Sequence, residues 1–222
     1  MLKPYATKLE NIKSEITQIG VDVVDAMELS LRALEDKKID SLKNIEITEK
    51  KLQVKSNEID NMILTTLALY SPEAKDLRQL VSYLKITNEL VRTGSNAKDF
   101  AKKFKKSYSD DLNTSMILEY TIPLLKSALL SLQTSISMLD EVNPQHIEER
   151  YHRVIVEESK TDDLYLMIEK NILKLISKNL DLSKEYFDIL SSLRRLEKIA
   201  DRAVSIANLL HFAQVGGDIV QS

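Results

Sequence analysis

The chain has 222 residues, and its 31 basic and 34 acidic side chains leave a formal net charge of −3, which gives it no general attraction for nucleic acid. Four glycines and four prolines are too few for the turns of a hairpin-rich β fold or a doubly wound α/β fold. There is no cysteine, which excludes disulfides, thiolate metal sites and cysteine nucleophiles. Together these counts predict an all-α protein.

Local signals for membranes and phosphate ligands are also missing. The first ten residues lack the apolar core of a signal peptide, and the longest uncharged run, 203–217, has 15 residues where a membrane span needs about 20. The four glycines form no phosphate-binding loop, and aromatic residues are 5% of the chain with no tryptophan. The sequence therefore offers no motif for phosphate, nucleotide or single-stranded nucleic acid, and we expect a cytoplasmic protein.

The few helix breakers divide the chain into six segments. The motifs Ser71-Pro72-Glu73 and Asn143-Pro144 each place a capping side chain before a proline, which is typical of a helix start. With breaks in the polar stretch 107–113 and at Asp181, these motifs predict helices at 5–35, 38–70, 72–106, 114–141, 144–179 and 182–213. Helices of about 30 residues pack side by side as bundles.

Several of these segments carry a seam, in which residues that face a neighbouring helix recur at alternating steps of three and four. In the second segment the seam consists of Leu42, Ile45, Glu49, Leu52, Ser56, Ile59 and Ile63. The fifth segment repeats it 109 residues later with Tyr151, Val154, Glu158, Thr161, Tyr165, Ile168 and Ile172. The seam of the last segment matches residues 84–101 at an offset of 106 and consists of Leu190, Leu193, Glu197, Ala200, Val204, Ala207 and His211. The repeats predict two tandem three-helix bundles, in 1–108 and 109–222.

Two pairs of acids lie on the seams of the second repeat. Glu158 and Asp162 are four residues apart on the fifth segment, and Glu197 and Asp201 are four residues apart on the sixth. If these helices pack together, the four carboxylates converge and repel one another. A hard cation such as Mg²⁺, Mn²⁺, Ca²⁺ or oxidised iron would relieve the repulsion, so the pattern favours a metal site.

Two other readings of these acids stay open. They belong to solvated helix faces, or they form salt bridges with the cationic side chains within one turn of Glu197, which are Arg194, Arg195 and Lys198.

The first repeat keeps only one of the four acids. Its matching positions are Glu49, Gln53, Val91 and Ser95. Because a valine is what a bundle seam takes when no ion is bound, we expect the metal site of the first repeat to be lost or weak.

Three stretches of the chain carry motifs of a known family: 195–207 with an acid-x-x-x-Asp motif, 70–78 with a Pro-x-Ala-x-Asp-Leu-Arg motif, and the first helix over 9–35. They resemble the metal-binding helix, the signature and the opening helix of the PhoU family, helical accessory proteins of bacterial phosphate uptake and phosphate signalling. The resemblance covers essentially the whole chain and implies two three-helix bundles. The resemblance implies that Glu197 and Asp201 are metal ligands, with Glu158 and Asp162 as their partners. In the first repeat the matching metal-binding motif, at 91–95, keeps its arginine and glycine but neither acid.

The resemblance implies a regulatory adaptor and not an enzyme. Family members are thought to report the state of the phosphate importer, an ABC transporter, to a membrane sensor histidine kinase and to restrain phosphate-starvation genes. We therefore expect the transporter ATPase and the kinase as partners, no nucleic-acid partner, a place beside the inner membrane through those partners, and a homodimer as one oligomeric state. Iron is the first choice of metal, with zinc, manganese and magnesium as alternatives.

Two other functions remain open: a carboxylate metal-storage bundle or metalloenzyme, and a PhoU-like accessory of another phosphate transporter. The motif Glu149-x-x-His152 has the spacing of di-iron oxidase ligands, but those sites need a second such motif, which the other two histidines do not supply. The third segment ends in lysines that favour either a solvated helix end or a docking patch for an anionic membrane or an acidic partner; they are Lys98, Lys102, Lys103, Lys105 and Lys106.

Overall fold

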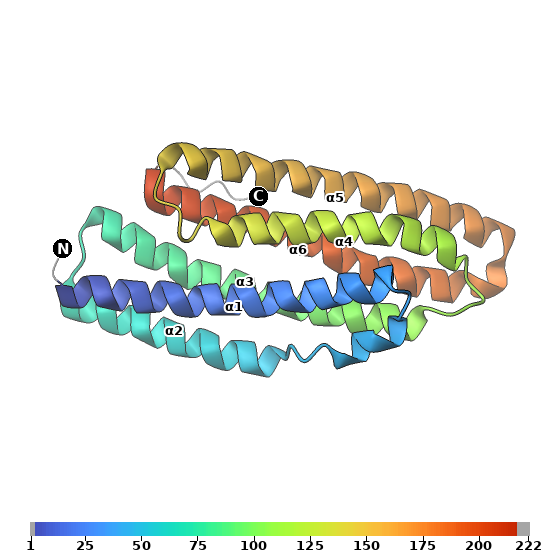
Figure 1. Cartoon of the computed structure of the whole chain (residues 1–222), viewed down its shortest axis with the longest axis horizontal. Helices are drawn as coiled ribbons and strands as arrows, with labels where there is room; N and C mark the ends of the chain where they lie inside the picture. The colour runs from blue at the N-terminus through green and yellow to red at the C-terminus, as the bar shows by residue number, and fades with distance from the viewer. Residues whose placement is uncertain (1–2, 217–222) are drawn as a thin grey trace.

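The structure, a computed structural model, describes residues 3–216 and places six long α-helices side by side along one axis (Figure 1). They are α1 (Lys3–Glu35), α2 (Glu49–Tyr70), α3 (Ala74–Ser107), α4 (Thr114–Ser137), α5 (Pro144–Lys178) and α6 (Ser183–Val215). Two short 3₁₀ helices, η1 (Ile39–Asn44) and η2 (Leu180–Leu182), lie in the connections. The described range contains no strand, so the all-α class is confirmed.

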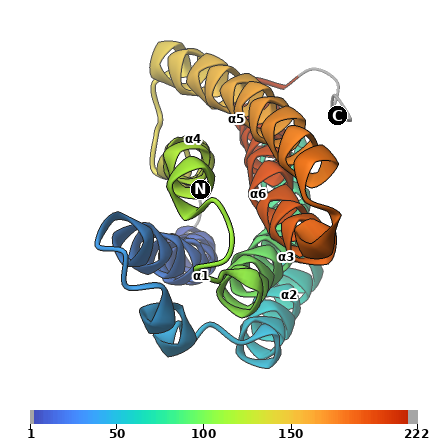
Figure 2. The ribbon, with the colours of Figure 1, turned by 90° about the vertical axis from the view of Figure 1, so that its right-hand side faces the viewer.

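The helices form two three-helix bundles, because α1, α2 and α3 pack together in the first and α4, α5 and α6 in the second. Figure 2 shows the two bundles end-on, one beside the other. Between the bundles, α3 lies against α6 and α1 lies against α4. One buried apolar cluster runs through both, and its largest fully buried side chains include Tyr83, Phe100 and Phe104. The predicted pair of tandem bundles is confirmed, and α6 is placed between α5 and α3.

The helix predicted at 38–70 is wrong at its start. The short helix η1 ends at Asn44, and residues 45–48 lie outside any helix before α2 begins. Thr48 caps α2, because its hydroxyl accepts a hydrogen bond from the backbone N–H of Lys51. Leu42 is still buried, although it lies on η1 and not on α2, so the heptad pattern ran across a break in the helix. The other five predicted helices agree with the structure to within four residues at each end.

Helix α4 is the one described helix whose length and mean hydropathy would suit a membrane span. In the structure 56% of that apolar stretch is buried, and α4 packs against α1, α5 and α6. An apolar helix covered on several sides by other helices has the environment of a bundle core.

Helix caps contribute measurable stability. Asn113 precedes α4, and its side-chain oxygen accepts a hydrogen bond of 3.1 Å from the backbone N–H of Met116. We expect Asn113→Ala to lower the free energy of unfolding by about 1 kcal/mol in urea denaturation, because that N–H loses its acceptor. The control is Asn11→Ala on an exposed position inside α1, where alanine favours the helix. An equal loss in both variants would contradict the capping role.

Candidate metal centre

Helices α5 and α6 run side by side through the second bundle (Figure 2). Their seams are buried as predicted, with Thr161 and Ile168 of α5 and Leu193 and Ala200 of α6 fully covered. The acids of the same seams are more exposed than these apolar neighbours, so they stand at the edge of the packed surface. This position lets a carboxylate stay near water while its oxygens face the partner helix.

The structure brings together three of the four predicted ligands. Glu158, Asp162 and Asp201 each offer a carboxylate oxygen, and these oxygens all lie within 4.8 Å of one another. The fourth predicted ligand, Glu197, is not part of that set. Its Oε2 atom is buried and lies 3.8 Å from Nε of Arg194. The site is therefore a cluster of three carboxylates with a fourth beside it.

Burial and mutual repulsion act on the ionisation of these acids. Burial is the largest cause that raises the pKa of Glu158, and the charges of Asp162, Asp201 and Glu197 raise it further. Burial also raises the pKa of Asp201 and of Glu197, and in both cases the charge of Asp162 adds to the effect. The pKa of Asp162 is raised by burial and then by Asp163. Ionised together, the four carboxylates are costly.

Unsatisfied oxygens show that the residues present fit a cation. Asp162 Oδ1 and Glu197 Oε2 are buried and have no hydrogen-bond partner among the described residues. A buried carboxylate oxygen without a donor is unfavourable, and a hard cation is the partner that several such oxygens can share. The donor set is all oxygen, which suits iron, manganese or magnesium better than zinc.

The competing salt bridges form only in part. Arg194 approaches Glu197 at 3.8 Å, but Arg195 pairs with Asp99 of α3 at 3.7 Å and so serves the other face of α6. Lys198 makes no ion pair within the described residues. Burial and the neighbouring acids still raise the pKa of Glu197 and that of Asp201. The charges of Arg194 and Lys198 lower both pKa values, and Arg202 also lowers that of Asp201, but they do not reverse the shift.

The histidines take no part in this cluster. His152 Nε2 lies 3.0 Å and His211 Nε2 lies 2.8 Å from the two carboxylate oxygens of Glu148. The spacing of Glu149 and His152 therefore does not produce a second set of ligands at the carboxylates.

The matching positions of the first repeat line one cleft of about 610 Å³, formed by α2, α3 and α6. Glu49 is exposed there, Gln53 donates a hydrogen bond to Asn57, and the hydroxyl of Ser95 bonds to the carbonyl of Val91. No set of three acids occurs at this cleft in the described part of the chain.

Sequence reasoning missed the cations of this cleft that come from α6. They are Arg195 and Arg202, and their spacing of seven positions puts both on one face of the helix, opposite the acids. That spacing was the available signal.

The raised pKa values predict how pH acts on the protein without metal. Because the acids hold protons more tightly when folded, the free energy of unfolding should fall as pH rises from the ordinary carboxyl range, about pH 4, through the raised values. We expect chelator-treated wild type to lose more stability as pH rises above the ordinary carboxyl range, about pH 4, than an Asp162→Asn/Asp201→Asn variant, measured by thermal denaturation. With saturating metal the trend should reverse, because protons then compete with the ion. If the stability of the two metal-free proteins changed with pH in the same way, the cluster acids would not be the cause of the pH dependence.

The fold and the site define an all-helical protein, made of a duplicated three-helix bundle with a carboxylate cluster between its last two helices. The sequence profile of the PhoU domain matches residues 16–104 and 124–210. The chain belongs to the PhoU family.

Relatives and solved structures cover nearly the whole chain. The "phosphate-specific transport system accessory protein PhoU homolog" of Xylella fastidiosa (strain 9a5c) is 25% identical over 213 residues, 96% of this chain and 87% of that protein. The protein of the same name from Caulobacter vibrioides (strain NA1000 / CB15N) is 23% identical over 220 residues, 98% of this chain and 93% of its own. The crystal structure of PhoU from Pseudomonas aeruginosa shares the fold with a TM-score of 0.82 at 18% identity, covering 96% of this chain and 100% of that one. The crystal structure of PhoU from Streptococcus pneumoniae has a TM-score of 0.79 at 18% identity and covers 98% of this chain and 100% of that one.

Proposed function

We propose that this protein is a regulatory adaptor of phosphate homeostasis, which links a phosphate ABC importer to a sensor histidine kinase and restrains the phosphate-starvation response. The observation that carries the proposal is the match of both repeats to the PhoU domain. Relatives that match over most of their length are named accessory proteins of the phosphate-specific transport system, which supports the importer as one partner. The adaptor would be cytoplasmic and reach the inner membrane through its partners.

The carboxylate cluster gives the adaptor a metal-dependent shape. Glu158, Asp162 and Asp201 would hold the ion, with Glu197 as a fourth ligand, and iron is the first candidate, followed by manganese, magnesium and zinc. The ion supplies positive charge that offsets the repulsion between α5 and α6. Since α6 also packs against α3, the position of α6 affects the surface that both bundles present. The role of the metal is then structural and not catalytic.

The partner test uses purified protein as bait for the importer ATPase and for the cytoplasmic part of the kinase. We expect the wild type to capture both, and the Asp162→Asn/Asp201→Asn variant to capture them more weakly. The control is Asp188→Asn, an exposed acid of α6 outside the cluster. In the host, deletion of the gene should switch on a phosphate-starvation reporter in phosphate-rich medium. A reporter that stays off, together with no capture of either partner, would contradict the adaptor.

The same purified wild type and variant proteins also distinguish the alternative functions. A storage bundle would hold many metal ions for each chain, and a metalloenzyme would lose a measurable reaction in the Asp162→Asn/Asp201→Asn variant. An accessory of another phosphate transporter would capture that transporter's cytoplasmic subunit in place of the ABC ATPase. Sedimentation of the purified chain tests the expected homodimer.

A further inference from the structure

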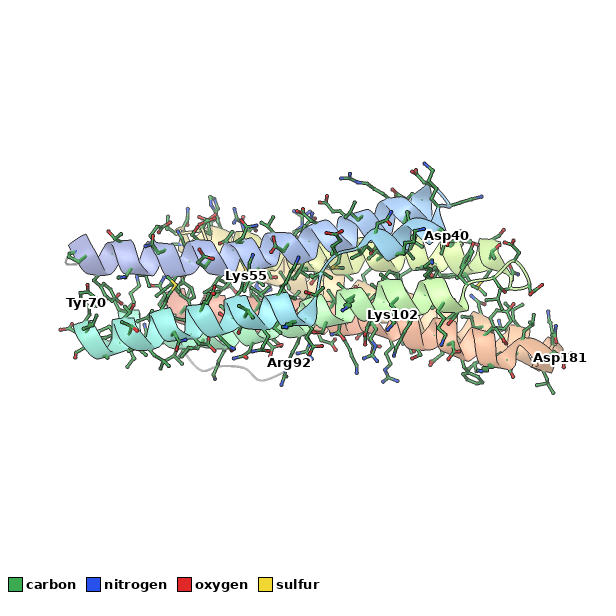
Figure 3. The ribbon with its side chains drawn as sticks, turned by 90° about the horizontal axis from the view of Figure 1, so that it is seen from below. Asp40, Lys55, Tyr70, Arg92, Lys102 and Asp181 are labelled. Carbon is green, nitrogen blue, oxygen red and sulfur yellow. The ribbon has the colours of Figure 1, made fainter. Side chains whose placement is uncertain are left out.

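Five of the twelve residues that line the cleft of the first repeat are cations, and we call it the basic cleft. Its cationic residues are Arg92, Lys98 and Lys102 of α3 and Arg195 and Arg202 of α6. Two carboxylates, Glu49 and Asp99, lie in the same lining. Figure 3 shows Arg92 and Lys102 along the side of the molecule where α2 and α3 lie beside α6. Side chains from both repeats therefore build one positively charged depression of about 610 Å³.

Carboxylates pair with the two α6 cations of the cleft but not with its three α3 cations. Arg202 Nη1 lies 2.6 Å from Glu89 Oε2, and Arg195 Nη2 lies 3.7 Å from Asp99 Oδ2. Among the described residues, no carboxylate lies within 4.0 Å of the charged atoms of the three α3 cations, Arg92, Lys98 and Lys102.

The guanidinium groups of α6 also keep unused donors. The Nε atoms of Arg195 and Arg202 are buried and have no hydrogen-bond partner among the described residues. Each arginine has five N–H donors, so one ion pair leaves most of its capacity unused. The lining adds the amide side chains of Asn88 and Asn96, of which Asn96 is 7% exposed. The positive charges of the lining outnumber its carboxylates by five to two.

The internal duplication allows the charges at matching positions of the two repeats to be compared. The second repeat has a carboxylate cluster where the first repeat has Val91 and Ser95, and the first repeat has lost those negative charges while arginines and lysines surround the same positions. Like charges held together at a surface repel whichever their sign, and a bound counter-ion relieves the repulsion. The counter-ion of the first repeat is then an anion.

The chemistry of the donors selects the class of anion. Arginine side chains present planar pairs of N–H groups that match the oxygens of phosphate, and lysines add point charges. A neighbouring depression of about 490 Å³ shares Lys98 and Lys102 with the basic cleft and has Leu42, Ile45 and Ala101 in its lining. That apolar floor suits the organic part of a phosphate ester.

We propose that the basic cleft binds a phosphate-group oxyanion, either free phosphate or the phosphate of a small ester. No sequence motif indicates such a site, because its donors come from α3 and α6, which are far apart in the chain. The proposal rests on the cleft and holds whether or not the protein docks on a transporter or a kinase.

The test is calorimetric titration of the full chain with orthophosphate and, separately, with ATP in buffered chloride. We expect saturable binding of orthophosphate to the wild type that weakens at least tenfold in Arg92→Gln/Lys98→Gln. These two side chains have no ion pair to lose, so the variant should fold normally, which its thermal denaturation checks. The control is Arg153→Gln/Lys170→Gln, two exposed cations of α5 outside the cleft, and it should bind like the wild type.

Two arms complete the experiment. Tighter binding of ATP than of orthophosphate would assign the neighbouring apolar depression to the ester, and equal or weaker binding would assign the cleft to free phosphate. Absence of saturable binding to either anion, or equal affinity of the wild type and the Arg92→Gln/Lys98→Gln variant, would overturn the proposal. Binding that disappears on treatment with a chelator would also overturn it, because the anion would then sit on the metal of the second repeat.

Discussion

The Asp162→Asn/Asp201→Asn variant should bind metal on the order of 100-fold more weakly than the wild type, or lose it altogether. The structure places these two side chains on different helices, with Glu158 as the third member of the cluster. Asparagine keeps the volume of aspartate but offers a neutral oxygen, so the variant removes two of the three converging charges. Elemental analysis after dialysis and competition with a coloured chelator measure the loss.

The stability of the same variant supplies a second readout. Without metal it should be at least as stable as the wild type, because the wild type then holds repelling carboxylates together. With metal the order should reverse, since only the wild type gains the free energy of binding. The control is Asp181→Asn/Asp188→Asn, two exposed acids away from the cluster, which should bind metal like the wild type. Equal loss in both double variants would show that the metal does not depend on the cluster.

Gly94→Val should lower the free energy of unfolding by about 3 kcal/mol. A side chain at this position of α3 would enter the space of Leu52 on α2, and the side chains of Ile47 and Val23 also lie within 3.4 Å of where its Cβ would be. Leu52 is 2% exposed and has little room to move. The better helix propensity of a residue with a side chain offsets only about 0.5–1 kcal/mol of this overpacking. Urea denaturation measures the difference.

The contact itself is tested by a double-mutant cycle. Gly94→Ala and Leu52→Ala each destabilise, the first by crowding and the second by leaving a cavity. Combined, the added methyl group fills part of the cavity, so the double variant should be more stable than the sum of the single losses predicts. Strict additivity would show that Gly94 and Leu52 do not meet.

Most of the fold followed from the spacing of apolar residues along the chain. Steps of three and four identified α5 and α6 and their buried residues, such as Tyr165 and Leu193, and the repeat of that pattern indicated two bundles. The break between η1 and α2 was missed because no glycine or proline marks residues 45–48. Leu42 kept the heptad step from a 3₁₀ helix, and periodicity does not distinguish that case from a continuous helix.

The candidate site could be predicted to the level of helix faces. The spacing of the two acid pairs predicted that all four carboxylates converge, and three of them, Glu158, Asp162 and Asp201, do meet. Glu197 lies outside that set and is 3.8 Å from Nε of Arg194, an ion pair that helix spacing alone does not predict. The spacing of Arg195 and Arg202 places them on one face of α6, but the basic cleft itself could not be predicted, because it depends on which face of α6 packs against α3.

The most direct test of the metal centre is anomalous X-ray diffraction from crystals of the wild type grown with iron, or with manganese as a second metal. The account predicts a strong anomalous peak between α5 and α6, within bonding distance of Glu158, Asp162 and Asp201. Crystals soaked in millimolar metal that show no peak there, with these carboxylates pointing apart into water, would contradict it.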